Sequence, residues 1–214
     1  MRTCLKLWKD WETLNGKPPV DYIYIMIFDE DIKEALTTLR NGGIILYPTD
    51  TIWGFGCDPT NPAAVEKIFR IKSREPGKSL LILVDGEPML ERYVSEVPDV
   101  AWELTGVSED PLTIIYPGGK NLAAGVCGED GSVGIRICHD EFCRELIKKF
   151  RKPVVSTSAN FSGKSSPGTF SEIEIPVIEA ADYVVKYRQD DRRKYSSSPV
   201  IKLSSDGTIK IIRK

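Results

Sequence analysis

Short apolar runs alternate with amphipathic helical patterns along most of this chain, and that alternation constrains the fold more than any other feature. Ile44–Tyr47 is a continuous apolar run between Gly43 and Pro48, which is typical of a strand buried on both faces. The apolar residues just before it have the spacing of one helix face: Ile32, Ala35, Leu36 and Leu39. Strands interleaved with helices predict an α/β domain, and late strands without intervening helices predict a mixed sheet.

The same pattern places the other elements. Asp29 and Gly42 are the expected start and stop of the first helix, and Asn61-Pro62 opens a second one with a capping side chain and a proline. Further helices are expected near 88–94, 98–105, 140–150 and 172–181, the last one interrupted by Pro176. Further strands are expected at 80–84, 112–116, 133–138, 154–156, 183–185, 200–203 and 209–212.

Residues 1–27 are expected to be an N-terminal extension, with a single domain over 28–214. The linker-like run Asn15–Pro19 lies within this extension. It is followed by Tyr22–Ile27, whose aromatic and β-branched residues predict a strand.

The composition excludes several classes of protein. Hydrophobic residues make up 41% and charged residues 28% of the 214 residues, which excludes disorder as the dominant state. The formal net charge of −2 argues against binding of nucleic acid through bulk charge. No apolar run approaches the roughly 18 residues of a membrane helix, and the first residues do not resemble a signal peptide. We therefore expect no membrane contact and a cytoplasmic location.

The cysteine and histidine counts bear on metal sites. The five cysteines form no Cys-x-x-Cys pair, and His139 is the only histidine. These counts argue for free thiols and against a zinc site, so we expect no metal held by protein ligands.

Two segments near the middle of the first half carry polar residues that suggest a site. Pro48–Gly56 follows a buried strand, where ligands of α/β sheets bind, although a plain turn explains this segment about equally well. Lys72 and Arg74 lie at the end of the second helix, where both cations can converge on a polyphosphate. The favourable effect of cations at helix C-termini is the simpler explanation of that pair.

Two later segments add to this set. Ser156–Gly163 presents several hydroxyls and an amide after a strand, which suits a nucleotide or a simple Ser/Asn-rich turn. Arg136 interrupts an otherwise largely apolar strand, so it lies on a solvated face or points at an anion. Its guanidinium fork fits a carboxylate.

Taken in order, these segments resemble the YrdC/Sua5 family, whose members are L-threonylcarbamoyladenylate synthases that act in the t6A modification of tRNA. The matching elements are PTDTIWGFG from Pro48, KSR from Lys72, PLT from Pro111, VGIRI from Val133 and STSANFSG from Ser156. The resemblance runs from about Asp29 to Arg213. It implies a YrdC-like twisted mixed sheet flanked by helices.

The resemblance also implies roles for individual positions. The expected catalytic residues, which also hold the ATP phosphates, are Lys72 and Arg74. The other nucleotide-binding residues are Thr113, Asn160 and Arg213, and the substrate-binding residues are Thr49, Arg136, Ser158 and Ser198. Arg136 would pair with the carboxylate of threonine. The chain departs from the family pattern at Asp110, where glycine is usual, and at Pro199, where threonine is usual.

The implied reaction joins L-threonine, bicarbonate or CO2, and ATP, and it releases pyrophosphate. Mg²⁺ is expected to accompany ATP. tRNA and the downstream threonylcarbamoyl-transferase proteins are candidate partners. Lys72 and Arg74 anchor no core, so alanine at either position is expected to abolish turnover and to leave the fold intact. The charged stretch Lys186–Lys194 is a candidate cover for the labile product, although a solvated loop suits its composition better.

Two other functions fit the same residues. A double-stranded RNA or tRNA-binding module without catalysis would use Lys72 and Arg74 as part of a basic patch. A carbamoyl-phosphate-dependent adenylating domain would cleave ATP without any need for threonine.

Overall fold

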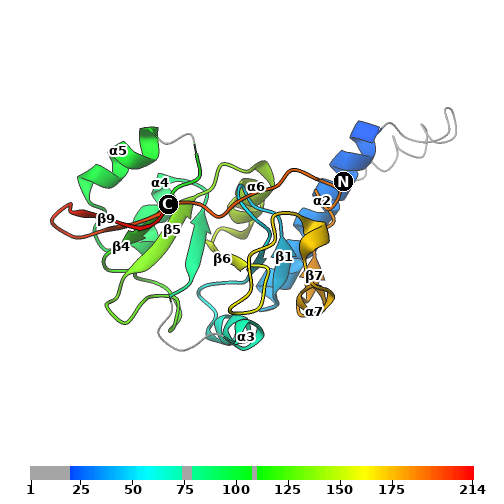
Figure 1. Ribbon diagram of the computed structural model, residues 1–214, viewed down its shortest axis with the longest axis horizontal. Coiled ribbons are helices and arrows are strands. Elements are labelled where there is room, and N and C mark those ends of the chain that lie inside the picture. The colour runs from blue at the N-terminus through cyan, green and yellow to red at the C-terminus, as the bar shows by residue number, and fades with distance from the viewer. Residues whose placement is uncertain (1–19, 74–78, 108–109) are drawn as a thin grey trace, which may run out of the picture.

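The computed structural model describes residues 20–73, 79–107 and 110–214 (Figure 1). Within these ranges a single mixed sheet of nine strands forms the centre, in the order β7-β1-β2-β6-β3-β5-β4-β8-β9. The strands are β1 (Ile45–Tyr47), β2 (Gly54–Gly56), β3 (Leu81–Val84), β4 (Thr113–Tyr116), β5 (Val133–Ile137), β6 (Val154–Ser158), β7 (Tyr183–Val184), β8 (Val200–Leu203) and β9 (Ile209–Arg213). Three of the pairs, β1–β7, β3–β5 and β4–β8, are parallel and the others are antiparallel. The predicted mixed α/β sheet is confirmed.

Helices flank this sheet. They are α2 (Val20–Arg40), α3 (Pro62–Lys72), α4 (Glu87–Tyr93), α5 (Asp99–Val107), α6 (Glu141–Phe150) and α7 (Ile175–Glu179), with a short 3₁₀ helix, η1 (Phe170–Glu172). Helix α2 packs on α6 and against β1 and β7, while α4 and α6 both pack against β3. In the parts of the chain that the structure describes, each helix falls short of the length and apolarity needed to cross a membrane.

The N-terminus of α3 is capped by its own sequence. The side chain of Asn61 accepts hydrogen bonds from the backbone N–H groups of Ala63 and Ala64, at 3.0 and 3.3 Å, and Pro62 occupies the first turn. The predicted capping arrangement is confirmed. This cap bears on the proposed phosphate-binding residues because α3 carries Lys72 at its C-terminal end.

Removing that cap has a measurable cost. We expect Asn61→Ala to lower the free energy of unfolding by about 1 kcal/mol, because two N–H groups lose their acceptor. Urea denaturation checks this value. Asn61→Asp, which keeps an acceptor at the same place, is the matched control and should stay close to wild type; an equal loss in both variants would contradict the capping argument.

The beginning of the described chain differs from the expectation. Tyr22–Ile27 is helical rather than a strand, and Asp29 lies inside α2 instead of starting it. The β-branched and aromatic run does not enter the sheet, because Tyr24, Ile25 and Met26 lie on an exposed stretch of helix. The rings of Tyr24 and Phe28 both contact the ring of Tyr187, with centroids 5.1 Å apart in each pair. Tertiary packing thus overrides local strand propensity here. The division at residue 27 into an extension and a domain stays a prediction.

Two other elements also differ from the sequence-based expectation. The single helix expected near 172–181 is split into η1 and α7, and Pro176 lies in the first turn of α7, where a missing N–H has no cost. Strand β2 lies inside the segment that we interpreted as a turn or ligand loop. Its two glycines allow close packing, since a Cβ on Gly54 would lie 2.9 Å from the carbonyl oxygen of Thr157 on β6.

Candidate functional site

A cavity of about 340 Å³ opens over the middle of the sheet. Its volume falls at the lower end of the range of small-ligand pockets. The polar residues that line it are Thr51, Ser79, Thr113, Arg136, Ser156, Thr157, Ser158, Ser166, Ser197, Ser198 and Arg213. They come from the loop before β2, the residues before β3, the strands β4, β5, β6 and β9, the loop after β6 and the segment before β8, so segments far apart in the sequence share one cavity. Hydroxyls and two guanidinium groups dominate its lining.

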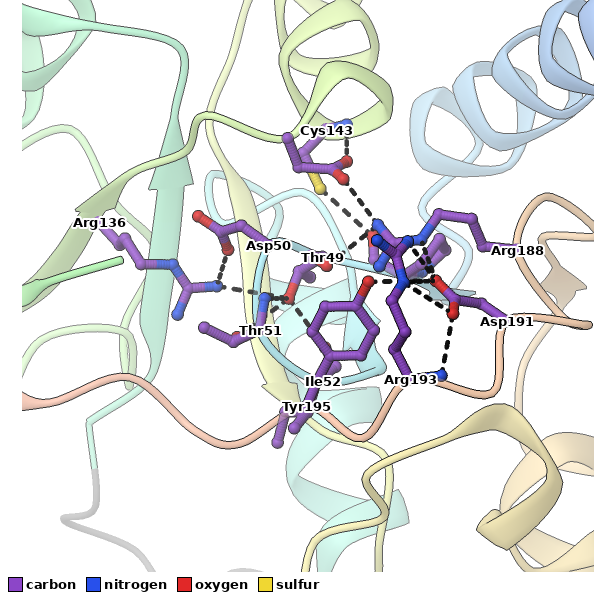
Figure 2. Close-up of polar contacts among 12 residues, drawn as sticks. Thr49, Asp50, Thr51, Ile52, Arg136, Cys143, Arg188, Asp191, Arg193 and Tyr195 are labelled. Carbon is purple, nitrogen blue, oxygen red and sulfur yellow. Dashed lines mark hydrogen bonds and ion pairs between the residues drawn. The ribbon is translucent and has the colours of Figure 1, made fainter. Parts of the chain in front are cut away.

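Arg136 is the buried cation of this cavity. Strand β5 holds it with only 2% of its side chain exposed, and its Nη2 lies 2.8 Å from the Asp50 carboxylate in an ion pair (Figure 2). Nη1 donates to the hydroxyl of Ser198 at 3.3 Å, and Nη2 lies 3.5 Å from the hydroxyl of Thr49. We call these four residues, Thr49, Asp50, Arg136 and Ser198, the Arg136 network. The pair with Asp50 offsets the cost of burying a guanidinium in an apolar strand.

The loop after β1 presents Thr49 and Asp50 to Arg136. The Thr49 hydroxyl donates to the carbonyl of Ile52 at 2.8 Å and accepts from the N–H of Thr51 at 3.1 Å, which closes a tight local turn. The Cys143 thiol donates to the carbonyl of Pro48 at 3.3 Å. Burial raises the pKa of Cys143 well above its ordinary value, so this thiol is a neutral donor. Hydrogen bonds within the loop, and one from Cys143 of α6, therefore fix the conformation of this loop.

A third set of contacts closes the cavity near β8. The hydroxyls of Thr113 and Ser198 lie 2.7 Å apart. Arg213, on the last strand, donates from Nε and Nη2 to the carbonyl of Ser198 at 3.0 and 2.7 Å. Burial, and then the nearby charge of Arg136, lower the pKa of Arg213. Two guanidinium groups, from β5 and β9, thus contact the same serine, and this concentration of positive charge favours binding of an anion nearby.

Lys72 forms a second cluster with the loop after β6. Its side chain is buried, and Nζ donates to the carbonyl of Ser158 at 2.7 Å and to the side-chain oxygen of Asn160 at 2.9 Å. It also donates to the hydroxyl of Ser158 at 3.3 Å and to the carbonyl of Asn160. We call Lys72, Ser158 and Asn160 the Lys72 cluster. These bonds join α3 to β6 and to the loop after it, so Lys72, which was expected to anchor no core, is a buried residue that links two elements of the fold.

The structure brings together most of the residues singled out in the sequence. Thr49, Arg136 and Ser198 share one network, which Thr113 and Arg213 join through Ser198; Lys72, Ser158 and Asn160 form the other cluster. Ser158 and Arg136 line the same cavity, so the two groups meet there. Arg74 lies outside the described residues.

Asp50 is a residue of the site to which the sequence analysis assigns no role. It lies in the same polar segment as Thr49, but we gave it no role. A signal was available: a charged residue in the middle of an apolar strand, Arg136, requires a buried anion as its partner. The side-chain oxygens of Asp50 are buried and make no hydrogen bond to the described residues besides the ion pair with Arg136.

Comparisons with known proteins agree on one family. The profile of the Sua5/YciO/YrdC family, described as "Telomere recombination", matches residues 37–214. A threonylcarbamoyl-AMP synthase of Pseudoalteromonas translucida is 33% identical over 157 residues, which cover 72% of this chain and 84% of the relative. A threonylcarbamoyl-AMP synthase of Vibrio cholerae is 31% identical over 170 residues, covering 78% and 90%.

Solved structures share the fold. E. coli YciO superposes with a TM-score of 0.72 at 24% identity and covers 86% of this chain and 88% of its own. P. abyssi Sua5, solved in complex with L-threonine, superposes with a TM-score of 0.72 at 26% identity over 80% of this chain. This chain spans half of the length of that Sua5 structure. The family profile covers well over half of the sequence, and the chain belongs to the Sua5/YciO/YrdC family.

Proposed function

We propose that this protein is an L-threonylcarbamoyladenylate synthase, which makes the precursor of the t6A modification of tRNA from L-threonine, bicarbonate or CO2, and ATP. The observation that carries the proposal is a single polar cavity lined both by the buried guanidinium of Arg136 and by Ser158, which accepts hydrogen bonds from Lys72. Relatives named threonylcarbamoyl-AMP synthase, at 31–33% identity over most of the chain, support the same activity.

The Arg136 network suits the amino acid substrate. A guanidinium binds a carboxylate through two parallel N–H groups, so Arg136 would hold the carboxylate of threonine. Thr49 and Ser198 each place a hydroxyl within 3.5 Å of that guanidinium, where they can orient a small polar molecule. Asp50 holds Arg136 in place through the ion pair at Nη2.

The Lys72 cluster suits the nucleotide. Lys72, together with Arg74, would neutralise the ATP phosphates, with Ser158 and Asn160 beside them. Thr113 and Arg213 line or border the same cavity and would contact the rest of the nucleotide. Mg²⁺ is proposed only as the ion that accompanies the ATP substrate. No group of three or more His, Cys, Asp or Glu side chains in the described ranges could hold a metal ion.

The chemistry needs positioning and charge more than covalent catalysis. The neutral amine of threonine bonds to the carbon of CO2 and releases one proton to water, which forms a carbamate. A carbamate oxygen then attacks the α-phosphorus of ATP, the bond to the β-phosphate oxygen breaks, and pyrophosphate leaves with the electron pair. Fixed cations at the pyrophosphate lower the barrier to that step. Lys72 is suited to this role because its ammonium is already held in place by the loop after β6.

The product is a reactive anhydride, so it has to pass to an acceptor before water cleaves it. We propose that the acceptor system is tRNA with the downstream threonylcarbamoyl-transferase proteins. The cytoplasm, where these components meet, is the proposed location.

Pyrophosphate release tests the proposal directly. We expect release only when threonine and bicarbonate are both present with Mg²⁺ and ATP, because the attacking carbamate forms from both. Release that persists without threonine would contradict the proposal, and release driven by carbamoyl phosphate would favour the adenylating domain. Salt-sensitive RNA binding without any turnover would favour the RNA-binding module.

A further inference from the structure

The segment Lys186–Pro199 connects β7 to β8 and crosses the front of the molecule (Figure 1). We call it the strap. At its start, the N–H groups of Lys186 and Tyr187 donate to the Asp31 carboxylate at 2.9 and 2.6 Å. At its end, the carbonyl of Pro199 accepts from the N–H of Thr113 at 3.1 Å. The strap therefore joins α2 to β4, and it carries Ser198 into the cavity.

Arg188 is a charged residue of the strap that turns inward. Its side chain is only 11% exposed, although the composition of the segment favours a solvated loop. Nη1 donates to the Asp140 carboxylate at 2.7 Å and to the carbonyl of Thr49 at 3.3 Å, and Figure 2 shows the guanidinium between Thr49 and Asp191. Nε lies 3.6 Å from an oxygen of Asp191. The expectation of a solvated loop is thus wrong for this residue.

The backbone of Arg188 is also unusual. Its φ of 64° lies in the left-handed region, which residues other than glycine rarely adopt. Such a conformation persists only where surrounding contacts over-determine it. Here the contacts are the ion pair with Asp140, which also caps α6, and the packing of the guanidinium over the Tyr195 ring, 5.0 Å from its centroid. The fold therefore stabilises Arg188 in one inward orientation.

The carbonyl that Arg188 binds belongs to a residue of the Arg136 network. Thr49 uses its backbone oxygen for Arg188 and its hydroxyl for the turn beside Arg136. The same strap holds Ser198 on the other side of Arg136. The Arg188 guanidinium thus links the Thr49 loop to the strap. The distance between the hydroxyls of Thr49 and Ser198, which both bind Arg136, depends on this link.

We propose that Arg188 is a positioning residue for threonine: it clamps the Thr49 loop to the strap, so that Thr49 and Ser198 face Arg136 at a fixed separation. This inference rests on the proposed function and deepens it. Arg188 does not reach the reacting atoms. Its polar contacts among the described residues go to Thr49, Asp140 and Asp191, and not to the Lys72 cluster, so its effect falls on threonine rather than on ATP.

Steady-state kinetics of pyrophosphate release test the proposal with three variants. We expect Arg188→Ala to raise the KM for threonine at least tenfold and to leave the KM for ATP within twofold of wild type. Arg188→Lys keeps the charge but loses the planar guanidinium, whose Nη1 has N–H groups in fixed directions toward both acceptors and whose plane packs on Tyr195, so it should give a smaller rise of the same kind. Arg192→Ala removes an exposed arginine from the same strap and is the matched control, expected to change neither KM.

Several results would overturn the inference. One is an unchanged KM for threonine in Arg188→Ala, and another is an equal rise in the KM for ATP. A rise of the same size in Arg192→Ala would also do so, since it would mean that any loss of charge from the strap matters. If Arg188→Ala does not fold, calorimetric titration of Arg188→Lys with threonine alone decides, because weaker binding than wild type is expected.

The two proposals fail in different ways. If the wild-type protein shows no threonine-dependent release of pyrophosphate, the proposed function is wrong. If the wild type is active and the Arg188 variants keep its affinity for threonine, only the role of Arg188 is wrong.

Discussion

The Lys72→Met variant is expected to lose about 100-fold or more in kcat/KM, since removing one fixed charge that stabilises a transition state typically costs 10²–10³. Methionine keeps the length of the stem but leaves the pyrophosphate without the buried ammonium. Lys67→Met, on the same helix and half exposed, is the matched control and should keep wild-type activity. Activity of Lys72→Met within threefold of wild type would remove Lys72 from the site.

The same variant also has a structural cost. Nζ of Lys72 donates to the carbonyls of Ser158 and Asn160, and methionine leaves both without that donor. An unsatisfied buried acceptor costs about 1–3 kcal/mol, so urea denaturation should show a loss of that order. The variant should still be folded at 25 °C, which allows its activity to be measured on folded protein.

The second large effect concerns Arg136. We expect Arg136→Leu to raise the KM for threonine about 100-fold or more, because the substrate carboxylate loses a charged bidentate partner. It also leaves the Asp50 carboxylate buried without a cation, which typically costs about 3–5 kcal/mol of stability. Arg144→Leu, which removes an exposed arginine from α6, is the control and should change neither quantity.

A double variant separates the two consequences. In Asp50→Asn/Arg136→Leu neither buried charge remains, so most of the lost stability should return, while the KM for threonine should stay high. Thermal denaturation and pyrophosphate release measured on the same samples check this. Recovery of activity together with stability would mean that Arg136 serves only the fold.

Much of the fold could be predicted from local patterns. The buried run at Ile45–Tyr47 and the apolar stripe of α6 follow from periodicity, and the start of α3 follows from Asn61 and Pro62. Tyr22–Ile27 could not be predicted in this way, because the same aromatic and β-branched residues suit a strand and are helical here. Strand β2 was missed because Gly54 and Gly56 have low strand propensity; they are needed for close packing, which is a property of the neighbouring strands.

The residues of the candidate site could likewise be predicted only in part. Lys72, Ser158 and Arg136 could be singled out as polar residues beside predicted strand and helix ends, and the order of their motifs, which resembles the YrdC/Sua5 family, implied their roles. Their partners could not be predicted. Asp50 looked like an ordinary turn residue until the ion pair with Arg136 appeared, and Arg188 looked like one charge in a solvated loop.

The sequence by itself determined where most of the helices and strands form and which polar side chains stand out, since both depend largely on residues within about one turn or strand of each other. Only the tertiary structure decided which of those side chains meet. Lys72 reaches Ser158 across 86 positions and Arg188 reaches Thr49 across 139, because strand order and helix packing bring them together. Hydrogen bonds and ion pairs act over a few ångströms, so their partners are set by the path of the chain in space, which local patterns do not encode.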